Sequence, residues 1–469
     1  LGNVIVSDAG YPGTGPTGCV EMCGQHEQAL GHSYNQQILK ENPRYADEKL
    51  QAYVQQVGER VAKNSHRSNL SYHFTVVDSP DINAFALPGG YIYIHRGLLA
   101  YLSSEAELAA VLGHEVGHVT ARHSVQQQSQ STAWGILGQA VAIGTGVSAA
   151  ADVTNVLGTA VVSGYGRDME LEADGLGAQY LARSGYDPQA MIEVVKVLKN
   201  QEVFARDQAA KRGQAVPESS YHGVFDSHPD NDRRLQEVIG PARALAGGKQ
   251  EVNREVFLQH LEGLPFGDSA ATGVRRGQHF YHAELGIALD FPDGWALLNR
   301  PDAVIVHTAD QQAFVAMTVS AAEPGLSPEE LLRQRAKGQR LVQEQTLKGG
   351  GLHGYTGIIA GTPAKRVAII YKDSRAYQFI AAVKGRGSLE SEDQHFMQVI
   401  NSFRPLAAAE AKLAQPLRVH LRKAKAGDKM AALATASKWP DDPQATLRLL
   451  NGLYPEGEPR PGDWLKILR

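Results

Sequence analysis

The first half of the chain places apolar residues at helical spacing. Between residues 50 and 61, four such positions fall three or four apart, namely Leu50, Val54, Val57 and Val61. This spacing puts side chains on one face of a helix, so we expect residues 26–68 to form helices. Local propensity then predicts a strand at Tyr72–Val77 and a turn at Asp78–Asp81.

A second amphipathic helix is predicted after Ser104. Ser104 can cap its start, and Glu107 stands three residues later as the reciprocal partner of a capping box. The buried stripe of this helix would consist of Leu108, Val111, Leu112 and Val119. Another helix is expected at Met191–Phe204, followed by a polar loop at Ala205–Phe225.

The pattern changes to short strands between His279 and Pro405. Five are predicted: Ile287–Phe291, Ala303–His307, Phe314–Ser320, Arg366–Tyr371 and Tyr377–Val383. Two helices, Pro328–Gln345 and Glu392–Ser402, interrupt them, and a composition shift at Gly263–Gly277 marks a linker. We therefore predict a multidomain chain. Its parts are a flexible N-terminal segment (1–25), a mainly α-helical domain with a small sheet (26–255), a linker (256–277), an α+β module (278–408) and a small C-terminal module (409–469).

Composition narrows the class of protein. The chain has 469 residues, of which 43% are hydrophobic and 20% are charged, values typical of a soluble globular protein. The formal net charge is −4, and lysine and arginine form no long run. We therefore expect no nucleic-acid partner.

Within the second helix, the sequence His114-Glu115-Val116-Gly117-His118 places two histidines four positions apart. Positions i and i+4 share one helix face, so both imidazoles can reach one cation. Glu115 would lie beside that cation, where it can accept a proton from a metal-bound water. The alternative is a pair of ordinary histidines on an amphipathic helix.

A catalytic zinc site usually needs a third protein ligand. The downstream sequence Glu170-Leu171-Glu172-Ala173-Asp174 offers acidic residues one helical turn apart. Glu170 could ligate the metal while Asp174 accepts a hydrogen bond from a ligand histidine and fixes its tautomer. A solvated acidic helix face is the alternative, but the two motifs together favour the metal site.

Taken together, these motifs resemble the zinc metallopeptidase family that includes the heat-shock protease HtpX, the CAAX prenyl protease and periplasmic BepA-type proteases. The resemblance implies a zincin-like fold with one Zn²⁺ per chain, and it makes Glu170, not Glu172, the third ligand. It extends to residues 83–90, which in such enzymes lead into an edge strand that pairs with an extended peptide substrate. The residues of this substrate strand are Gly90, Tyr91, Ile92 and Tyr93, with Ile94 beyond them.

The resemblance also covers Ser227-His228-Pro229 and the following Arg233 and Arg234. It implies that His228 can approach the zinc and occupy its open position in a self-inhibited state, and that Arg234 lies near the reaction centre. A helix-start loop with a solvated basic turn is the alternative.

The implied activity is zinc-dependent hydrolysis of unfolded or misassembled envelope proteins. A different class of function remains open, namely an envelope assembly or chaperone factor in which proteolysis is secondary or silent. Residues 291–295 and 401–403 resemble PsbP-like α+β modules, and residues 417–469 resemble a LysM-type repeat. These resemblances imply docking on envelope proteins or contact with peptidoglycan.

Two features bear on location. Cys19 and Cys23 are the only cysteines, and a disulfide between them would suit an oxidising compartment; two free thiols are the alternative. From Ser124 to Ala151 no residue is charged, but glutamine and small residues dilute the stretch, so we expect small-residue helices beside the site rather than a membrane span. We predict an exported, periplasmic or cell-envelope protein.

Overall fold

The computed structural model describes residues 17–124, 165–211, 231–245, 250–384, 387–437, 439 and 442–469. The chain divides into two compact units. Unit 1 contains Leu1–Gly138, Val161–Leu261 and Leu449–Gly457, and unit 2 contains Gln139–Ala160, Glu262–Arg448 and Glu458–Arg469. Each unit is described by itself below.

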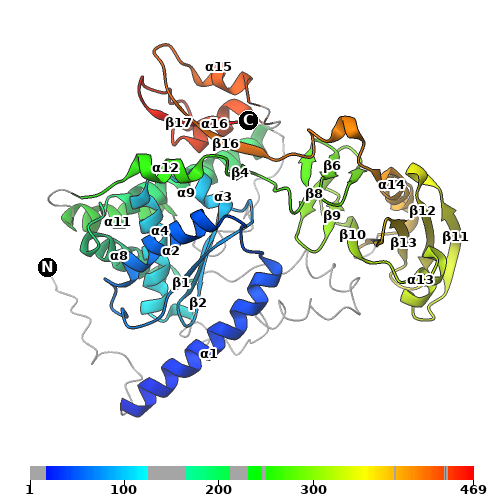
Figure 1. Cartoon of the computed structure of the whole chain (residues 1–469), viewed down its shortest axis with the longest axis horizontal. Helices are drawn as coiled ribbons and strands as arrows, with labels where there is room; N and C mark the ends of the chain where they lie inside the picture. Colours follow the sequence, from blue (N-terminus) through cyan, green and yellow to red (C-terminus); the bar gives the residue numbers. More distant parts are fainter. Residues whose placement is uncertain are drawn as a thin grey trace. The chain divides into compact units, whose positions relative to one another are not determined.

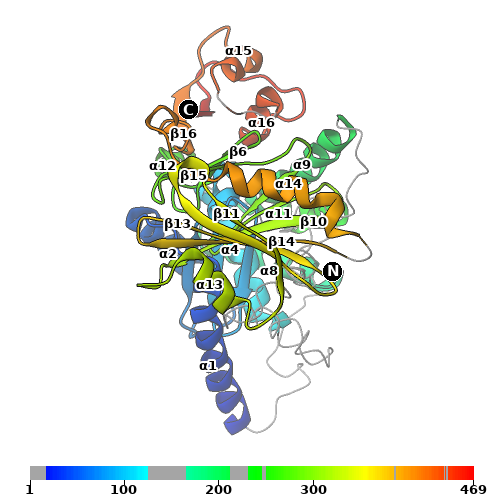
Figure 2. The ribbon, with the colours of Figure 1, turned by 90° about the vertical axis from the view of Figure 1, so that its right-hand side faces the viewer.

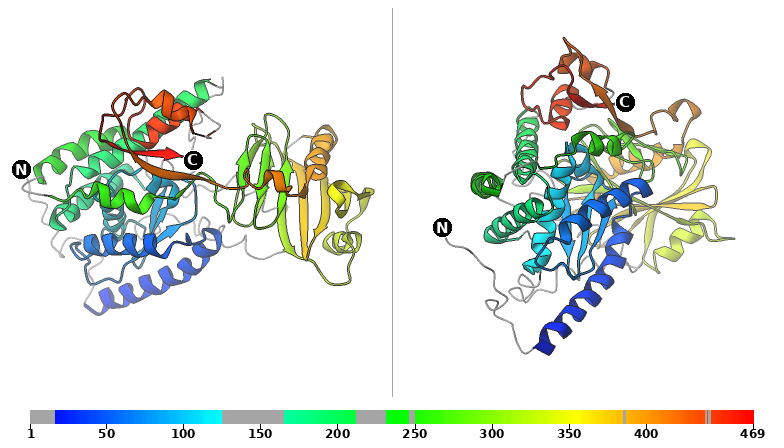
Figure 3. Two further views of the ribbon diagram at one scale, coloured as in Figure 1. Left: turned by 45° about the horizontal axis from the view of Figure 1, so that its top comes forward. Right: turned by 60° about the vertical axis from the view of Figure 1, so that its left-hand side comes forward.

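Unit 1 is a set of helices around a small sheet. Its helices are α1 (Thr17–Glu41), α2 (Glu48–Ala62), α3 (Arg96–Tyr101), α4 (Glu105–Thr120), α8 (Arg167–Arg183), α9 (Ala190–Lys211), α11 (Asn231–Leu245) and α12 (Arg254–Leu261). Its strands are β1 (His73–Val77), β2 (Ala84–Leu87) and β3 (Tyr91–His95). Helices α2 and α4 lie against this sheet (Figure 1 and Figure 3). The predicted helical character of this region is confirmed.

The amphipathic stripes behave as predicted. Leu50, Val54, Val57 and Val61 of α2 are all buried, as are the four predicted core residues of α4. Helices α4 and α8 approach closely because small residues face each other. A Cβ atom on Gly117 would lie 2.9 Å from the backbone oxygen of Ala173. This close approach brings the two helices that carry the sequence motifs together.

The predicted substrate strand is not an edge strand. The sheet order is β1-β3-β2, with β3 parallel to β1 and antiparallel to β2. Tyr91, Ile92 and Tyr93 therefore have both backbone edges occupied, and Gly90 accepts a hydrogen bond from His73. The strand was predicted correctly, but its place in the sheet was wrong, since strand order depends on pairing partners that β-propensity does not encode.

Helix α1 begins inside the segment that we predicted to be flexible. It starts at Thr17 and packs against the β2–β3 turn, where a Cβ on Gly31 would overlap the backbone oxygen of Pro88. Glu27 of α1 also forms a bidentate ion pair with Arg67. Cys19 and Cys23 fall one helical turn apart on α1, and the disulfide between them stays a prediction.

The C-terminal boundary of the helical domain was also placed too early. Buried Glu105 accepts hydrogen bonds from Tyr53, Tyr186 and Asn253. Because Asn253 directly precedes α12, its bond connects the start of α12 to the rest of unit 1. The predicted linker 256–277 is not a linker: it contains α12, β4 (Pro265–Phe266) and β5 (Val274–Arg276). Its glycines misled the prediction because they take positive φ at turns, namely Gly263, Gly267, Gly273 and Gly277.

Unit 2 is built on a seven-stranded antiparallel sheet with strand order β11-β12-β13-β14-β10-β9-β8. Its strands are β8 (Ala296–Asn299), β9 (Val304–His307), β10 (Ala313–Ala321), β11 (Leu341–Leu347), β12 (His353–Ile359), β13 (Lys365–Lys372) and β14 (Arg375–Val383). A second sheet has the order β15-β7-β6-β5. Its further strands are β6 (His279–His282), β7 (Ile287–Asp290) and β15 (Arg404–Pro405). The predicted α+β character is confirmed.

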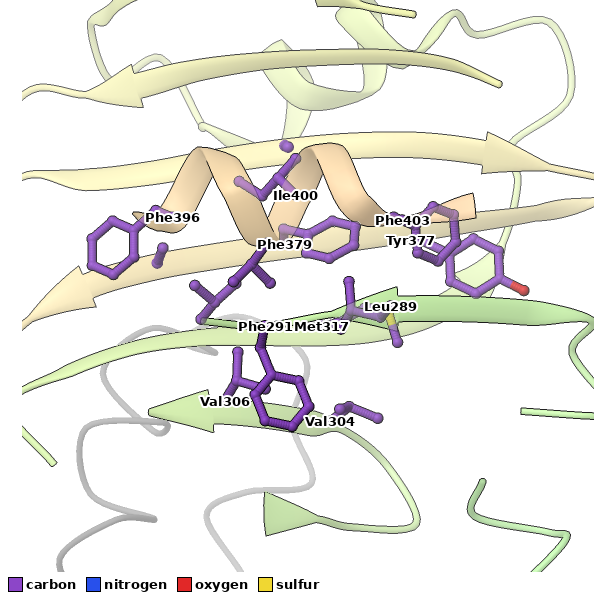
Figure 4. Packing of buried hydrophobic residues seen from close by; sticks show 14 of the residues in the cluster. Leu289, Phe291, Val304, Val306, Met317, Tyr377, Phe379, Phe396, Ile400 and Phe403 are labelled. Atoms are coloured by element: carbon purple, nitrogen blue, oxygen red, sulfur yellow. The ribbon is translucent and has the colours of Figure 1, made fainter. Parts of the chain in front are cut away.

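Helices cover both faces of the seven-stranded sheet. Helix α14 (Leu389–Ser402) lies on one face and α13 (Pro328–Arg335) on the other (Figure 2). Alternate residues of β13 pack against the two helices, as the two-residue repeat of a strand requires. On the α14 face, Phe396 and Ile400 gather with Phe379 in the larger core (Figure 4).

Helix α13 is shorter than predicted. It ends at Arg335, and the predicted helical residues 341–345 belong instead to β11. Lys337 and Gly338 both take positive φ, which stops the helix. Strands β6, β8, β11 and β12 were missed by the sequence analysis, since their runs are short or interrupted by polar residues.

The end of the chain forms a β-α-α-β arrangement. Its elements are β16 (Leu417–Lys423), α15 (Met430–Thr435), α16 (Pro443–Leu450) and β17 (Trp464–Leu468). Strand β16 pairs antiparallel with β17 and, through its first residues, with β4. The predicted helix at Met430 is confirmed. The LysM-like assignment of this module stays a prediction.

Candidate metal centre

Helix α4 presents the first motif. Ser104 caps the helix by accepting a hydrogen bond from the backbone N–H of Glu107, as predicted. The Glu107 carboxylate reaches back to the N–H of Ser103 rather than to that of Ser104. From this start, the helical repeat carries His114 and His118 to the side that faces α8, and both side chains are buried.

Glu170 of α8 joins the two histidines. The Nε2 atoms of His114 and His118 lie 3.0 Å apart, and each lies 3.5 Å from a carboxylate oxygen of Glu170. Glu170 is fully buried. Among the residues that the structure describes, this is the one group of three or more side chains with converging metal-binding atoms, all within 4.8 Å of one another.

The donor set suits a divalent metal ion such as zinc. Zinc binds histidine nitrogen and carboxylate oxygen at about 2.0–2.2 Å, so two ligand atoms of one ion stand at most about 4 Å apart. The distances of 3.0 and 3.5 Å between the present atoms lie within that limit. Two imidazoles and one carboxylate also leave a coordination position for a water.

Asp174, one turn after Glu170, contacts His114 from behind. Its Oδ1 lies 2.8 Å from Nδ1 of His114, which is the contact that the sequence analysis expected for a supporting carboxylate. Burial by itself lowers the pKa of His114, but its hydrogen bonds with Asp174 and Glu170 raise that pKa to about 9 in the absence of metal. Nε2 of His114 therefore needs a metal ion to displace its proton.

Arg234 of α11 balances the charge of Asp174. Its Nε and Nη2 donate to the two carboxylate oxygens at 2.8 Å each, and its Nη1 lies 3.4 Å from Glu170. Burial raises the pKa of Asp174, but Arg234 and His114 outweigh burial and bring that pKa to about 2. Arg233, the neighbouring candidate, instead forms a surface ion pair with Glu237.

A second histidine contact was missed by the sequence analysis. The Nδ1 atoms of His118 and His123 lie 2.8 Å apart, and Nε2 of His123 lies 3.2 Å from Glu172 on α8. The ring of Tyr165 stacks on that of His118, with 4.0 Å between the ring centroids. His123 lies beyond the end of α4 at Thr120, and Arg122 before it takes positive φ. Helical spacing therefore does not place it, and the available signal was only a third histidine five residues after His118.

Glu115 and His228 complete the predicted site residues. Glu115 is buried on α4 directly after His114, and its carboxylate interacts electrostatically with Arg234 and with Tyr165. His228 lies outside the described residues, as do most of the uncharged stretch 124–151 and the end of the predicted loop at 205–225. The start of that loop is helical, since α9 continues to Lys211.

Two other observations concern the sequence. His279 and His282 have a spacing like that of metal ligands, but neither belongs to the converging group, and His279 pairs with Asp290. In the described ranges, no helix has both the length and the apolar character needed to cross a membrane.

Comparison with known proteins identifies the helical domain. Residues 48–242 match the model of Peptidase family M48. This range contains both motifs and Arg234, so the predicted family of metallopeptidases is confirmed for this part of the chain.

Several curated proteins are similar in sequence. The "Beta-barrel assembly-enhancing protease" of Escherichia coli (strain K12) is 34% identical over 313 residues, covering 64% of this chain and 59% of that protein. The protein of the same name from Yersinia pestis is 34% identical over 245 residues, covering 50% of this chain and 47% of that protein. The "Mitochondrial metalloendopeptidase OMA1" of Arabidopsis thaliana is 38% identical over 138 residues, covering 29% of this chain and 28% of that protein. The matches cover 59% and 47% of the two beta-barrel assembly-enhancing proteases, so the chain spans about half the length of these curated relatives.

One solved structure resembles a part of the chain. Cyanobacterial PsbP (CyanoP) from Synechocystis sp. PCC 6803 has 13% sequence identity and a TM-score of 0.22, covering 28% of this chain and 95% of that chain. A TM-score this low establishes no shared fold, so the PsbP-like assignment of unit 2 stays a prediction.

Proposed function

Residues 48–242 form a domain of peptidase family M48, and from this premise we propose that the chain is a zinc-dependent endopeptidase acting on unfolded or misassembled envelope proteins. The observation that carries the proposal is the convergence of His114, His118 and Glu170 beside Glu115. A structural metal site would not need a carboxylate directly after its first ligand.

Each residue has a role in this proposal. His114, His118 and Glu170 would hold the zinc, which when bound would act as a Lewis acid and lower the pKa of a water molecule. Glu115 accepts the proton of the attacking water and passes it to the leaving amine. Asp174 fixes the tautomer of His114 through their 2.8 Å hydrogen bond.

Arg234 serves the site in two ways. It neutralises Asp174, so that a buried carboxylate can stand behind His114 without an uncompensated charge. Its Nη1 lies next to Glu170, on the edge of the ligand set, and from there it can stabilise negative charge that develops on the substrate carbonyl oxygen.

The substrate is expected to bind along β2. Strand β3 is central in the sheet, whereas β2 pairs only with β3 among the described residues, and β2 lies against α4. An extended peptide can add to the outer edge of β2 through main-chain hydrogen bonds. This placement replaces the strand of Gly90 to Tyr93 that the sequence had suggested.

His228 is proposed to restrain the enzyme at rest by occupying the coordination position that water needs. Replacing His228 with alanine should then raise peptidase activity on an unfolded substrate such as casein, measured at equal zinc content. Unchanged or lower activity in that variant would show that His228 does not restrain the site.

The names of the relatives support a proposal for location and partners. Two of them are named for β-barrel assembly, so we place this chain in the bacterial envelope, in the periplasm. The C-terminal half would dock on envelope proteins or peptidoglycan. A disulfide between Cys19 and Cys23, which stays a prediction, would suit that compartment.

A second candidate function is assembly support without essential proteolysis. The phrase "assembly-enhancing" in the names of the relatives favours it. The experiment that separates the two is cleavage of casein by the purified chain, with chelator and after zinc is restored. The peptidase proposal expects activity that disappears with chelator and returns with zinc, whereas an assembly factor alone expects none in any condition.

A further inference from the structure

His123 closes the far side of the candidate metal centre. Its side chain is fully buried, although it follows the end of α4 at Thr120 and belongs to neither sequence motif. One ring nitrogen, Nδ1, lies 2.8 Å from Nδ1 of His118. The other, Nε2, lies 3.2 Å from Oε2 of Glu172. The three side chains thus form a continuous row from a candidate ligand to a carboxylate that is half exposed.

The direction of these hydrogen bonds follows from the geometry of His118. Its Nε2 faces Nε2 of His114 and the Glu170 carboxylate, so Nε2 is the nitrogen that would bind the metal, and with the metal bound there the proton would be on Nδ1. Nδ1 of His118 then donates to Nδ1 of His123. His123 keeps its own proton on Nε2, which donates to Glu172. With the protons placed in this way, the contact between His118 and His123 and the contact between His123 and Glu172 are both hydrogen bonds.

We propose that His123 and Glu172 are positioning residues that fix the tautomer and ring orientation of His118 for metal binding. The inference rests on the proposed function, because it takes His118 to be a metal ligand. It also gives a role to Glu172, which lies between Glu170 and Asp174 in sequence but is not itself within the converging ligand set.

The two histidines are supported in different ways. His114 donates to a buried carboxylate whose charge Arg234 neutralises. His118 donates to a neutral imidazole, and the negative charge stands one residue further out, at the half-exposed Glu172. Removing the acceptor at His123 would leave the Nδ1–H of His118 buried without this hydrogen bond, which favours the wrong tautomer.

A packing role for His123 is the competing explanation, since Tyr165 also stacks on His118 and constrains its ring. Substitutions of similar volume separate the two. In the full-length chain, His123→Leu removes the acceptor and keeps apolar bulk, whereas His123→Gln keeps a side-chain oxygen that can accept from His118. Glu172→Leu removes the outer partner at a half-exposed position, where folding is not at risk.

The readout is zinc affinity, measured by competition with a chromophoric chelator, together with the visible spectrum of the Co²⁺-substituted chain. We expect His123→Leu to weaken zinc binding about 10–100-fold and to change the Co²⁺ spectrum. His123→Gln should recover most of the affinity, and Glu172→Leu should lose part of it.

Matched controls exclude a general effect of losing a buried histidine or a charge on α8. His95 is a buried histidine that contacts Asp81 and Phe85 and none of the candidate ligands named above, so His95→Leu should leave zinc affinity unchanged. Asp168 is exposed one turn before Glu172 on the same helix, so Asp168→Leu should also bind zinc as the wild type does.

Wild-type zinc affinity in folded His123→Leu would overturn the proposal, as would a loss in His123→Gln as large as that in His123→Leu. If His123→Leu does not fold, wild-type affinity in Glu172→Leu overturns it. These results are distinct from failure of the proposed function. In that case the wild-type chain itself would bind no zinc or would cleave no casein with zinc bound.

Discussion

At the scale of single residues, the sequence predicted those site residues whose relative positions depend only on their spacing within one helix. A single helix places His114, Glu115 and His118 close together. A second helix does the same for Glu170 and Asp174. His123 could not be found in this way, because its contact with His118 depends on how α4 ends. The place of Tyr91 in the sheet was equally hidden, since it depends on which strands pair on each side.

His95 shows a residue whose environment sets its ionisation. Its side chain is 6% exposed, and burial, only partly opposed by Asp81 at 4.0 Å, lowers its pKa to about 4. The unfolded chain has a pKa near 6.5 at this residue. Between these values the unfolded chain binds a proton that the folded chain does not, so stability is lost as the pH falls from about 6.5 towards 4.

The lowered pKa of His95 should make the free energy of unfolding of the wild type more sensitive to acid than that of His95→Leu. Lowering the pH from about 7.5 to about 5 should destabilise the wild type by about 2 kcal/mol more than the variant, which has no group to titrate there. Urea unfolding with chelator present measures both without a contribution from metal release. An equal loss of unfolding free energy in the two proteins would contradict the assignment.

At the scale of elements, type was predictable from periodicity but boundaries and neighbours were not. Helix α2 and strand β14 were found because their apolar residues repeat regularly. Helix α13 was drawn too long because the stop signal that Gly338 offers was not used in the prediction. Both Lys337 and Gly338 take positive φ in the structure. The glycines between α12 and β6 read as a linker, yet they form the turns between short paired strands.

The contact between α4 and α8 is the element-scale feature on which the site depends. A Cβ added at Gly117 would lie 2.9 Å from the backbone oxygen of Ala173. Backbone atoms cannot easily move to remove such a clash. Gly117→Ala should therefore force the helices apart and destabilise the chain by about 1–3 kcal/mol in urea unfolding. Zinc affinity should fall with it, because Glu170 and Asp174 flank Ala173.

A glycine on α8 supplies the matched control. Gly175 has open space around the position of a Cβ, so Gly175→Ala should stabilise the helix by about 0.5–1 kcal/mol. If Gly117→Ala and Gly175→Ala changed the free energy of unfolding by the same amount, the close approach of α4 and α8 would not be the cause of the effect of Gly117→Ala.

At the scale of the whole molecule, the family match covers residues 48–242, and the described sheets of unit 2 lie outside that range. Unit 2 has a separate hydrophobic core between its sheet and α14, while the candidate ligands lie entirely in unit 1. The sequence predicted this division into a helical part and an α+β part. It could not predict that residues 449–457 belong to unit 1, because such long-range contacts leave no local pattern.

Zinc should therefore stabilise one unit and not the other. Differential scanning calorimetry is expected to show two transitions, of which only that of unit 1 rises when zinc is added. At a free zinc concentration of about 100 times Kd, the gain is about 2.7 kcal/mol. A single transition that rises as a whole, or two that rise together, would contradict this prediction.

The central claim is that Glu115 activates the attacking water at a metal held by His114, His118 and Glu170. Glu115→Gln tests it directly, because the amide keeps the shape of the side chain but cannot accept the proton. Zinc content and casein cleavage are measured on the same preparation. The account predicts that the variant binds zinc as the wild type does and that its cleavage rate falls about 10²–10⁴-fold. Undiminished cleavage by the zinc-loaded variant would contradict it.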